Sequence, residues 1–132
     1  MTTTKHQGSC HCGAVKIEAE LDASAGTRCN CTICTKLGCI GTNMKPDAFR
    51  LIAGEDALGS YAMSPAAARY FCKRCGIYVF GKGHVAEIGG DFVSVNLNVL
   101  DDIDPGLLSV RYWDGRHDNW QAGPRDAAWP IA

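Results

Sequence analysis

Cys-His-Cys-Gly at residues 10–13 and Cys-Lys-Arg-Cys-Gly at residues 72–76 are the stretches that decide the fold of this 132-residue chain. Cysteines two or three positions apart bring two sulfurs to one ion, and the glycine that follows lets the backbone turn tightly and point N–H groups at sulfur. Two such pairs supply four thiolates, the usual closed tetrahedral set of a structural zinc site. Cysteines that merely pack as small apolar residues would not need this spacing. The spacing therefore predicts one structural zinc ion, held by Cys10, Cys12, Cys72 and Cys75.

A third group of cysteines, in the sequence Cys-Asn-Cys-Thr-Ile-Cys at residues 29–34, offers three sulfurs. Three protein ligands leave one coordination position open, which distinguishes catalytic zinc from structural zinc. Three thiolates give Zn²⁺ a formal charge of 2 − 3 = −1, and an exogenous thiolate would bring it to 2 − 4 = −2. The added thiolate would be held deprotonated at neutral pH and would remain nucleophilic. We therefore assign catalytic roles to Cys29, Cys31 and Cys34.

Cys39, five residues after this group, leaves three alternatives open. If the chain folds back, Cys39 becomes a fourth thiolate ligand and closes the site. If it does not, Cys39 is a small buried residue and the coordination position stays open. In the third alternative the middle cysteines are redox-active or weakly metallated thiols.

Length, composition and charge narrow the classes of function. A chain of 132 residues fits a single domain over 1–132, which can bury a core without needing a metal for size alone. The net charge of −1 shows no basic footprint for nucleic acid. No apolar run is long enough for a membrane span, and residues 1–13 lack the apolar region of a secretory signal. We expect a cytoplasmic protein that keeps its eight cysteines reduced and binds neither membrane nor nucleic acid.

Alternation of apolar and polar residues predicts a mainly β chain. It is strictest over 14–21 (AVKIEAEL) and 92–99 (FVSVNLNV). Shorter strands are expected at 48–53, 67–71, 77–80, 85–88 and 108–113. One helical turn is expected within 32–38, and the segment from Asp101 to Pro105 is expected to cap another. Residues 114–132 indicate irregular chain over the surface. The pattern favours small antiparallel sheets with cysteines at strand ends and turns.

The order of these motifs resembles the glutathione-dependent formaldehyde-activating enzyme family. The resemblance rests on G-S-C-H-C-G-A-V, C-x-C-x-x-C, D-A-F-R-L, F-C-x-x-C-G and V-S-V-N-x-x-x-L-D-D, and covers roughly residues 8 to 120. It implies a β-tent fold, in which small antiparallel sheets are pinned by zinc. It also implies two zinc sites, a structural one at Cys10, Cys12, Cys72 and Cys75 and a more labile one at Cys29, Cys31 and Cys34.

The activity that the resemblance implies is that of a carbon–sulfur lyase. The family reaction joins glutathione to formaldehyde and gives S-hydroxymethylglutathione, so the implied partners are a small thiol and an aldehyde. Glutathione carries two carboxylates and needs cationic partners. The cations nearest in sequence to the cysteine groups are Arg28, Lys36, Lys73 and Arg74.

The remaining polar residues have plainer interpretations. His11 lies between two expected ligands and is expected to face solvent, and His84 is expected in an exposed hairpin turn. His117 can donate a proton to a nascent alkoxide, although a solvated loop is the more ordinary role for its surroundings. The rival to the enzyme is a non-catalytic, zinc-stapled β domain that binds a protein partner. An open site beside a pocket favours the enzyme, whereas ligation by Cys39 or a flat apolar patch favours the binding domain.

Overall fold

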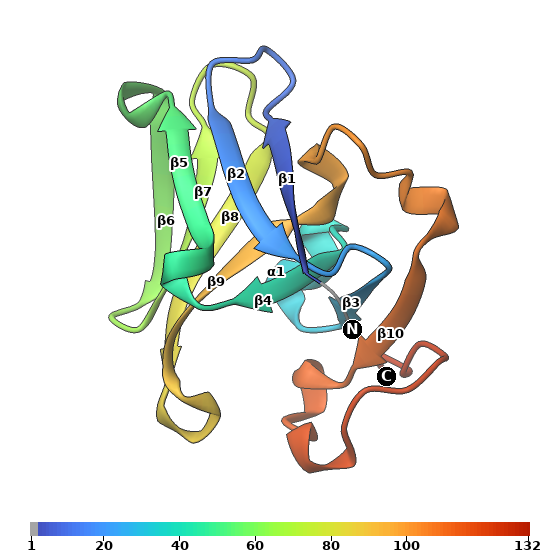
Figure 1. Cartoon of the computed structure of the whole chain (residues 1–132). Coiled ribbons are helices and arrows are strands. Elements are labelled where there is room, and N and C mark those ends of the chain that lie inside the picture. Colours follow the sequence, from blue (N-terminus) through green and yellow to red (C-terminus); the bar gives the residue numbers. More distant parts are fainter. Residues whose placement is uncertain (1–2) are drawn as a thin grey trace.

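Two β-sheets make up most of the computed structural model, which describes residues 3–132 (Figure 1). The smaller sheet has the order β1-β2-β5, with β1 (Thr4–Ser9), β2 (Lys16–Leu21) and β5 (Phe49–Ala53) all antiparallel. The larger sheet contains, in spatial order, β10 (Ser109–Trp113), β3 (Ala25–Cys29), β4 (Gly41–Met44), β9 (Gly90–Asn96), β8 (Tyr78–Val85), β7 (Ala67–Cys72) and β6 (Leu58–Ser64). This architecture confirms the predicted mainly β, tent-like fold.

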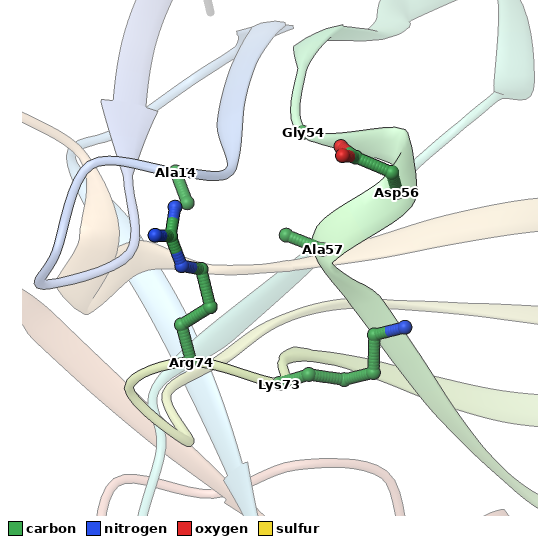
Figure 2. Close-up of a pocket in the computed structure, with 6 residues that line it drawn as sticks. All are labelled: Ala14, Gly54, Asp56, Ala57, Lys73 and Arg74. Carbon is green, nitrogen blue, oxygen red and sulfur yellow. The ribbon is translucent and has the colours of Figure 1, made fainter.

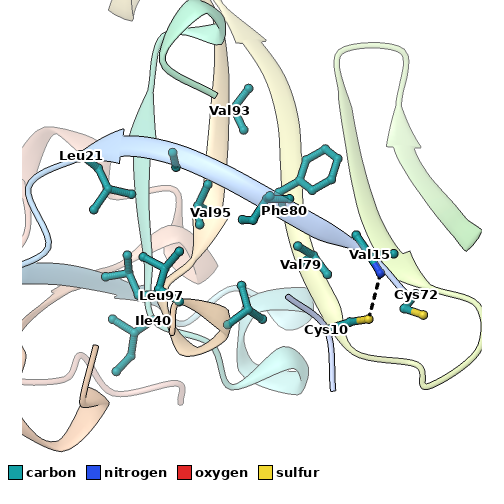
Figure 3. Close-up of a cluster of buried hydrophobic side chains, with 14 of the residues drawn as sticks. Cys10, Val15, Leu21, Ile40, Cys72, Val79, Phe80, Val93, Val95 and Leu97 are labelled. Atoms are coloured by element: carbon teal, nitrogen blue, oxygen red, sulfur yellow. Dashed lines mark hydrogen bonds between the residues drawn. The ribbon is translucent and has the colours of Figure 1, made fainter. Parts of the chain in front are cut away.

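The core lies between the two sheets. Along β2, Ile17, Ala19 and Leu21 are buried, which confirms the predicted alternation over 14–21. Their side chains join one apolar cluster with buried residues of β8 and β9, and Figure 3 shows β2 crossing these strands. Each fully buried aliphatic side chain of this kind contributes roughly 1.5–3 kcal/mol relative to exposure. The small sheet is therefore held against the large one by its apolar face.

One pair of strands in the large sheet is parallel, unlike the antiparallel pairing that the sequence predicts. The edge strand β10 runs parallel to β3, and its register places Trp113 opposite Cys29. A parallel pair requires a long connection, and here most of the chain lies between the two strands. This pairing carries the segment after β10 to the end of β3, where the middle cysteines begin.

The helical elements are short. Helix α1 (Thr32–Leu37) confirms the predicted turn within 32–38, and Gly38 ends it in the left-handed conformation with a φ of 65°. The other helical pieces are single 3₁₀ turns: η1 (Pro46–Ala48), η2 (Glu55–Ala57), η3 (Ala86–Ile88), η4 (Leu97–Val99), η5 (Pro105–Leu107), η6 (Gly115–His117) and η7 (Trp120–Ala122). Asp104 caps η5 by accepting from the amide of Gly106 at 2.9 Å, as the second predicted turn requires. Within residues 3–132 no helix is long and apolar enough to cross a membrane.

Two predicted strand boundaries are wrong. The strand expected over 92–99 ends at Asn96, because the Asn96 side chain accepts a hydrogen bond from the amide of Asn98 at 3.1 Å and starts η4. The segments 77–80 and 85–88 are not two strands either, since β8 runs on through Gly83 to Val85 and 86–88 forms η3. Gly83 lies inside the strand, and a side chain does not fit there because a Cβ would lie 2.5 Å from the ring of Phe92.

His84 consequently lies in strand β8 and not in a hairpin turn. Its Nδ1 lies 2.7 Å from a carboxylate oxygen of Asp91 on β9, the residue directly opposite in the register. His84 is thus part of an exposed cross-strand pair, away from the cysteine groups.

Candidate metal centres

The first cysteine group joins the two sheets. Cys10 and Cys12 lie in the turn between β1 and β2, whereas Cys72 ends β7 and Cys75 lies in the turn before β8. Their four Sγ atoms all lie within 4.8 Å of one another. The distances from Cys12 Sγ to the Sγ atoms of Cys10 and Cys72 are both 3.7 Å. A tetrahedral zinc with bonds of about 2.3 Å separates its sulfurs by about 3.8 Å, so this group fits the ion.

Backbone amides surround this group, as expected for thiolate ligands. Val15 N–H donates to Cys10 Sγ at 3.3 Å, drawn in Figure 3, and Arg74 N–H donates to Cys72 Sγ at 3.4 Å. Backbone hydrogen bonds from Cys12 and then Ile77 lower the pKa of the Cys75 thiol to about 6. Cys10 and Cys72 belong to the buried core. Four converging sulfurs are enough to fill the four positions of a tetrahedral ion.

The middle cysteine group lies where β3 passes into α1. Cys29 ends the strand, Cys31 is the N-cap residue of the helix and Cys34 lies within it. The three Sγ atoms lie within 4.8 Å of one another, and all three residues are partly exposed. Among residues 3–132, Cys39 is not a member of this group. Burial raises the pKa of the Cys39 thiol, which favours its neutral form.

A cation lies against this group. Arg69 on β7 donates through Nη2 to Cys34 Sγ at 3.4 Å and through Nη1 to the hydroxyl of Tyr78 at 3.1 Å. Its Nε is buried and has no acceptor among the residues that the structure describes. On the other side, the hydrogen bond with Cys34, assisted by the amides of Cys31 and Gly115, lowers the pKa of Cys29 to about 5 against the cost of burial. These contacts favour negative charge on Cys29, whereas the hydrogen bond to Cys29 and then burial raise the pKa of Cys34.

The loop after β10 is fastened to the same place. Asn30, between two of the cysteines, donates to a carboxylate oxygen of buried Asp114 at 2.8 Å and accepts from the amide of Arg116 at 2.9 Å. The Arg116 guanidinium also donates to the Asn30 carbonyl at 2.8 Å. Asp114 holds His117 through its Nδ1 at 2.8 Å. The hydrogen bond from Asn30, followed by those from His117 and Asn119, keeps the pKa of Asp114 below its usual value.

Comparison with known proteins identifies the family. Residues 5–115 match the family model described as "Glutathione-dependent formaldehyde-activating enzyme". The chain belongs to this family. Among solved structures, it is similar to a Rhodobacter sphaeroides protein from a structural genomics programme, with a TM-score of 0.72 and 31% identity. That similarity covers 81% of this chain and 99% of the other.

In the present chain, two hollows lie near the cysteine groups. The larger, about 450 Å³, is lined by Ala14, Gly54, Asp56, Ala57, Lys73 and Arg74 (Figure 2). Figure 2 shows the Arg74 guanidinium directed toward Ala14, on the turn that follows Cys12. No cysteine lines this hollow, and the neighbouring group of four sulfurs is closed. This hollow therefore offers no sulfur to a ligand bound in it.

The smaller hollow, about 230 Å³, opens on the middle group. Cys29, Cys34 and Cys39 all line it, together with Arg28. Cys39 is thus part of the wall and not of the three-sulfur cluster. Of the four cations considered from the sequence, Arg28 lines this hollow, Lys73 and Arg74 line the other, and Lys36 lines neither. His11 is exposed and outside both cysteine groups.

Several residues of the site escaped the sequence analysis. The position of Asn30 in the sequence could have indicated its role, because a polar side chain between two metal ligands is well placed to hold a neighbouring loop. Nothing in the sequence around Gly115 indicates its role, although a Cβ there would lie 2.5 Å from Cys29 Sγ. The same is true of Arg69, since it lies 35 residues beyond Cys34 and reaches it only through the sheet.

Proposed function

We propose that this chain is a zinc-dependent carbon–sulfur lyase that acts on a glutathione-type thiol and an aldehyde. The three-sulfur group beside a hollow carries the proposal, because Cys39 does not complete a set of four. Membership of the family supports a glutathione- and formaldehyde-related activity. The alternative is a zinc-stapled domain that binds a protein partner. It is less well supported, because ligation by Cys39 or a flat apolar patch would favour it, whereas Cys39 lies outside the three-sulfur group and lines a hollow.

We assign the metals on the chemistry of the donors. Thiolates are soft ligands that favour zinc over the hard cations, which prefer oxygen. Cys10, Cys12, Cys72 and Cys75 would hold a structural zinc, and Cys29, Cys31 and Cys34 would hold a second, more labile one. Seven reduced cysteines in these roles fit a cytoplasmic location, where thiols are not oxidised to disulfides.

A zinc ion at the middle group would supply a coordination position at which an incoming thiol is kept as thiolate. The protein residues have separate tasks. Arg69 offsets part of the negative charge that three thiolates and a substrate sulfur bring together. Arg28, at the hollow, can pair with a carboxylate of glutathione. The loop held by Asn30 and Asp114 fixes the backbone at Gly115 close to Cys29.

The reaction balances without an oxidant or reductant. In the forward direction the thiol loses its proton, its sulfur attacks the carbonyl carbon, and a carbon–sulfur bond forms. The electron pair of the C=O double bond moves to oxygen, which takes up, through water, the proton that the thiol released. Because formaldehyde adds thiols unaided, we expect the site to contribute mainly orientation of the two reactants.

Metal content tests the proposal directly. We expect two zinc ions per chain in the wild type and in Cys39→Ala, and one in Cys31→Ser. In a cobalt-substituted protein, glutathione should change the sulfur-to-cobalt absorption of the wild type but not of Cys31→Ser. Exchange between free formaldehyde and S-hydroxymethylglutathione, followed by NMR, should be faster with the wild type than with Cys31→Ser. Loss of one ion in Cys39→Ala, with no effect of glutathione, would show a closed structural site and favour the protein-binding alternative.

A further inference from the structure

The hollow at the middle cysteines has a second wall, which comes from the C-terminal part of the chain. This wall consists of Tyr112, Trp113, Ala128, Trp129 and Ile131. Three of these residues lie beyond position 115, where the match to the family ends. The part of the chain that faces the reactive sulfurs across the hollow is therefore an addition to what the family match covers.

This C-terminal segment is fastened to the edge of the sheet. Tyr112 and Arg125 form an isolated bridge, with the Tyr112 amide donating to Arg125 at 2.8 Å and the Arg125 amide donating back at 3.1 Å. The indole of Trp129 donates to the Tyr112 carbonyl at 2.9 Å. The guanidinium of Arg125 lies 3.8 Å from the centre of the Trp129 ring and donates to the Ala128 carbonyl at 2.7 Å. The second wall is thus a built part of the site.

The hollow is mostly apolar. Of its twelve lining residues, Arg28 is the only one with a permanent charge. Arg28 can pair with one carboxylate of glutathione, and the rest of the lining offers no charge to its second carboxylate or its ammonium group. Ile131 is 57% exposed although it lines the hollow, which leaves apolar surface for a ligand to cover. A volume of about 230 Å³ is ample for one ring, since an apolar cavity of about 150 Å³ binds benzene.

We infer that this hollow binds an aromatic or branched alkyl group on the carbon next to the substrate sulfur. The inference rests on the proposed lyase function and specifies its substrate class, an adduct of a thiol with an aldehyde larger than formaldehyde. Cys29 and Cys34 line the hollow, so a substrate sulfur bound beside them would place the group on its adjacent carbon in the hollow. Cleavage of the adduct breaks the carbon–sulfur bond, turns the C–OH carbon into the aldehyde and returns the hydroxyl proton to the thiol.

Unreactive thioethers test this inference by affinity, independently of turnover. S-methylglutathione and S-benzylglutathione differ only in the group on sulfur, and each is titrated calorimetrically into the zinc-loaded full chain. We expect S-benzylglutathione to bind about tenfold tighter or more, the effect of covering one ring in a partly open apolar site. Ile131→Ala should bring the ratio of the two dissociation constants toward one, and Trp129→Ala should do so more strongly.

Ile88→Ala is the matched control. Ile88 is 58% exposed against 57% for Ile131, but it lies in η3 and does not line the hollow. The ratio should therefore be unchanged in this variant. Equal affinity of the wild type for both thioethers would overturn the inference and leave the proposed function standing.

A third probe separates the two proposals. Benzyl alcohol carries the ring without the glutathione part. If neither thioether binds but benzyl alcohol does, and Ile131→Ala abolishes that binding, the apolar site stands and the glutathione assignment is refuted. If none of the three probes binds, both are refuted.

Discussion

Replacing Arg69 by methionine should weaken metal binding at the middle cysteines and leave the closed group unaffected. Arg69 is the cation that donates to Cys34 Sγ, at 3.4 Å. Among residues 3–132, the donors to the group of four cysteines from outside it are backbone amides. Methionine keeps an apolar stem of similar length, so the change removes the charge and its hydrogen bonds more than it removes packing. The variant therefore tests electrostatic support of a ligand.

The expected loss of metal affinity follows from the distance between Arg69 and Cys34 and from the burial of Arg69. Two unit charges 3.4 Å apart attract by about 5 kcal/mol at an effective dielectric constant of about 20. The net effect is smaller, because Arg69 is partly exposed and gives up some of its hydration to make this contact. Removing a residue that supports a metal ligand typically lowers metal affinity by about 10–100-fold, or about 1.4–2.7 kcal/mol. We expect a loss within that range.

Competition with a chromophoric chelator measures both sites in one experiment. In the wild type the two ions should leave in two phases, and Arg69→Met should shift only the weaker phase. Arg69→Lys keeps the charge but cannot reach both Cys34 and Tyr78 with one fork, so it should recover part of the affinity. The reasoning is refuted if Arg69→Met shifts both phases equally, which would indicate general destabilisation, or shifts neither.

Three further changes have defined expectations. Gly115→Ala should release the labile ion but not the structural one, because the added Cβ would lie 2.5 Å from Cys29 Sγ. Metal analysis after gel filtration measures this loss. Gly106→Ala, whose added Cβ would have its nearest contact at 3.2 Å, is the control. Leu97→Ala should lower the free energy of unfolding in urea by roughly 2–5 kcal/mol, because Leu97 is fully buried; a loss below 1 kcal/mol would contradict its place in the core. Asp102→Asn should destabilise the protein at neutral pH but not in acid. The hydrogen bond from His6 lowers the pKa of Asp102 below 3.8, so its stabilising contribution is present above that value and is lost as pH falls through the lowered pKa. A difference between wild type and Asp102→Asn in urea unfolding that does not shrink as the pH is lowered below 3.8 would contradict this assignment.

The sequence predicted those parts of the fold whose causes are local. The alternation over 14–21 is visible because β2 buries one face only, and the three cysteine groups are visible because ligand spacing is a property of a few residues. Strand β6 was missed for the opposite reason. It lies at the edge of the sheet, and residues such as Tyr61 and Met63 remain exposed, so no apolar face marks it.

The missing parts of the site depend on contacts between distant segments. The parallel pairing of β3 with β10 joins residues more than eighty positions apart, and it helps to bring Gly115 and Trp129 to the cysteines. Arg69 reaches Cys34 only because β7 and α1 come together in the folded chain. A single sequence gives no sign of such contacts, since none of these residues belongs to a local motif.

The spacing of the two cysteine groups along the chain has a consequence for how metal enters a newly made molecule. The middle three ligands lie within six residues, so an unfolded chain loses little entropy when they close around an ion. The other four come from segments sixty residues apart and meet only after β1, β2, β7 and β8 are in place. If both groups bind zinc as proposed, the middle group would therefore fill first, during synthesis, and the group of four last. Scarce zinc would divide between the two by kinetics before affinity decides, and a cell short of the metal would accumulate chains that are loaded locally but not yet locked together.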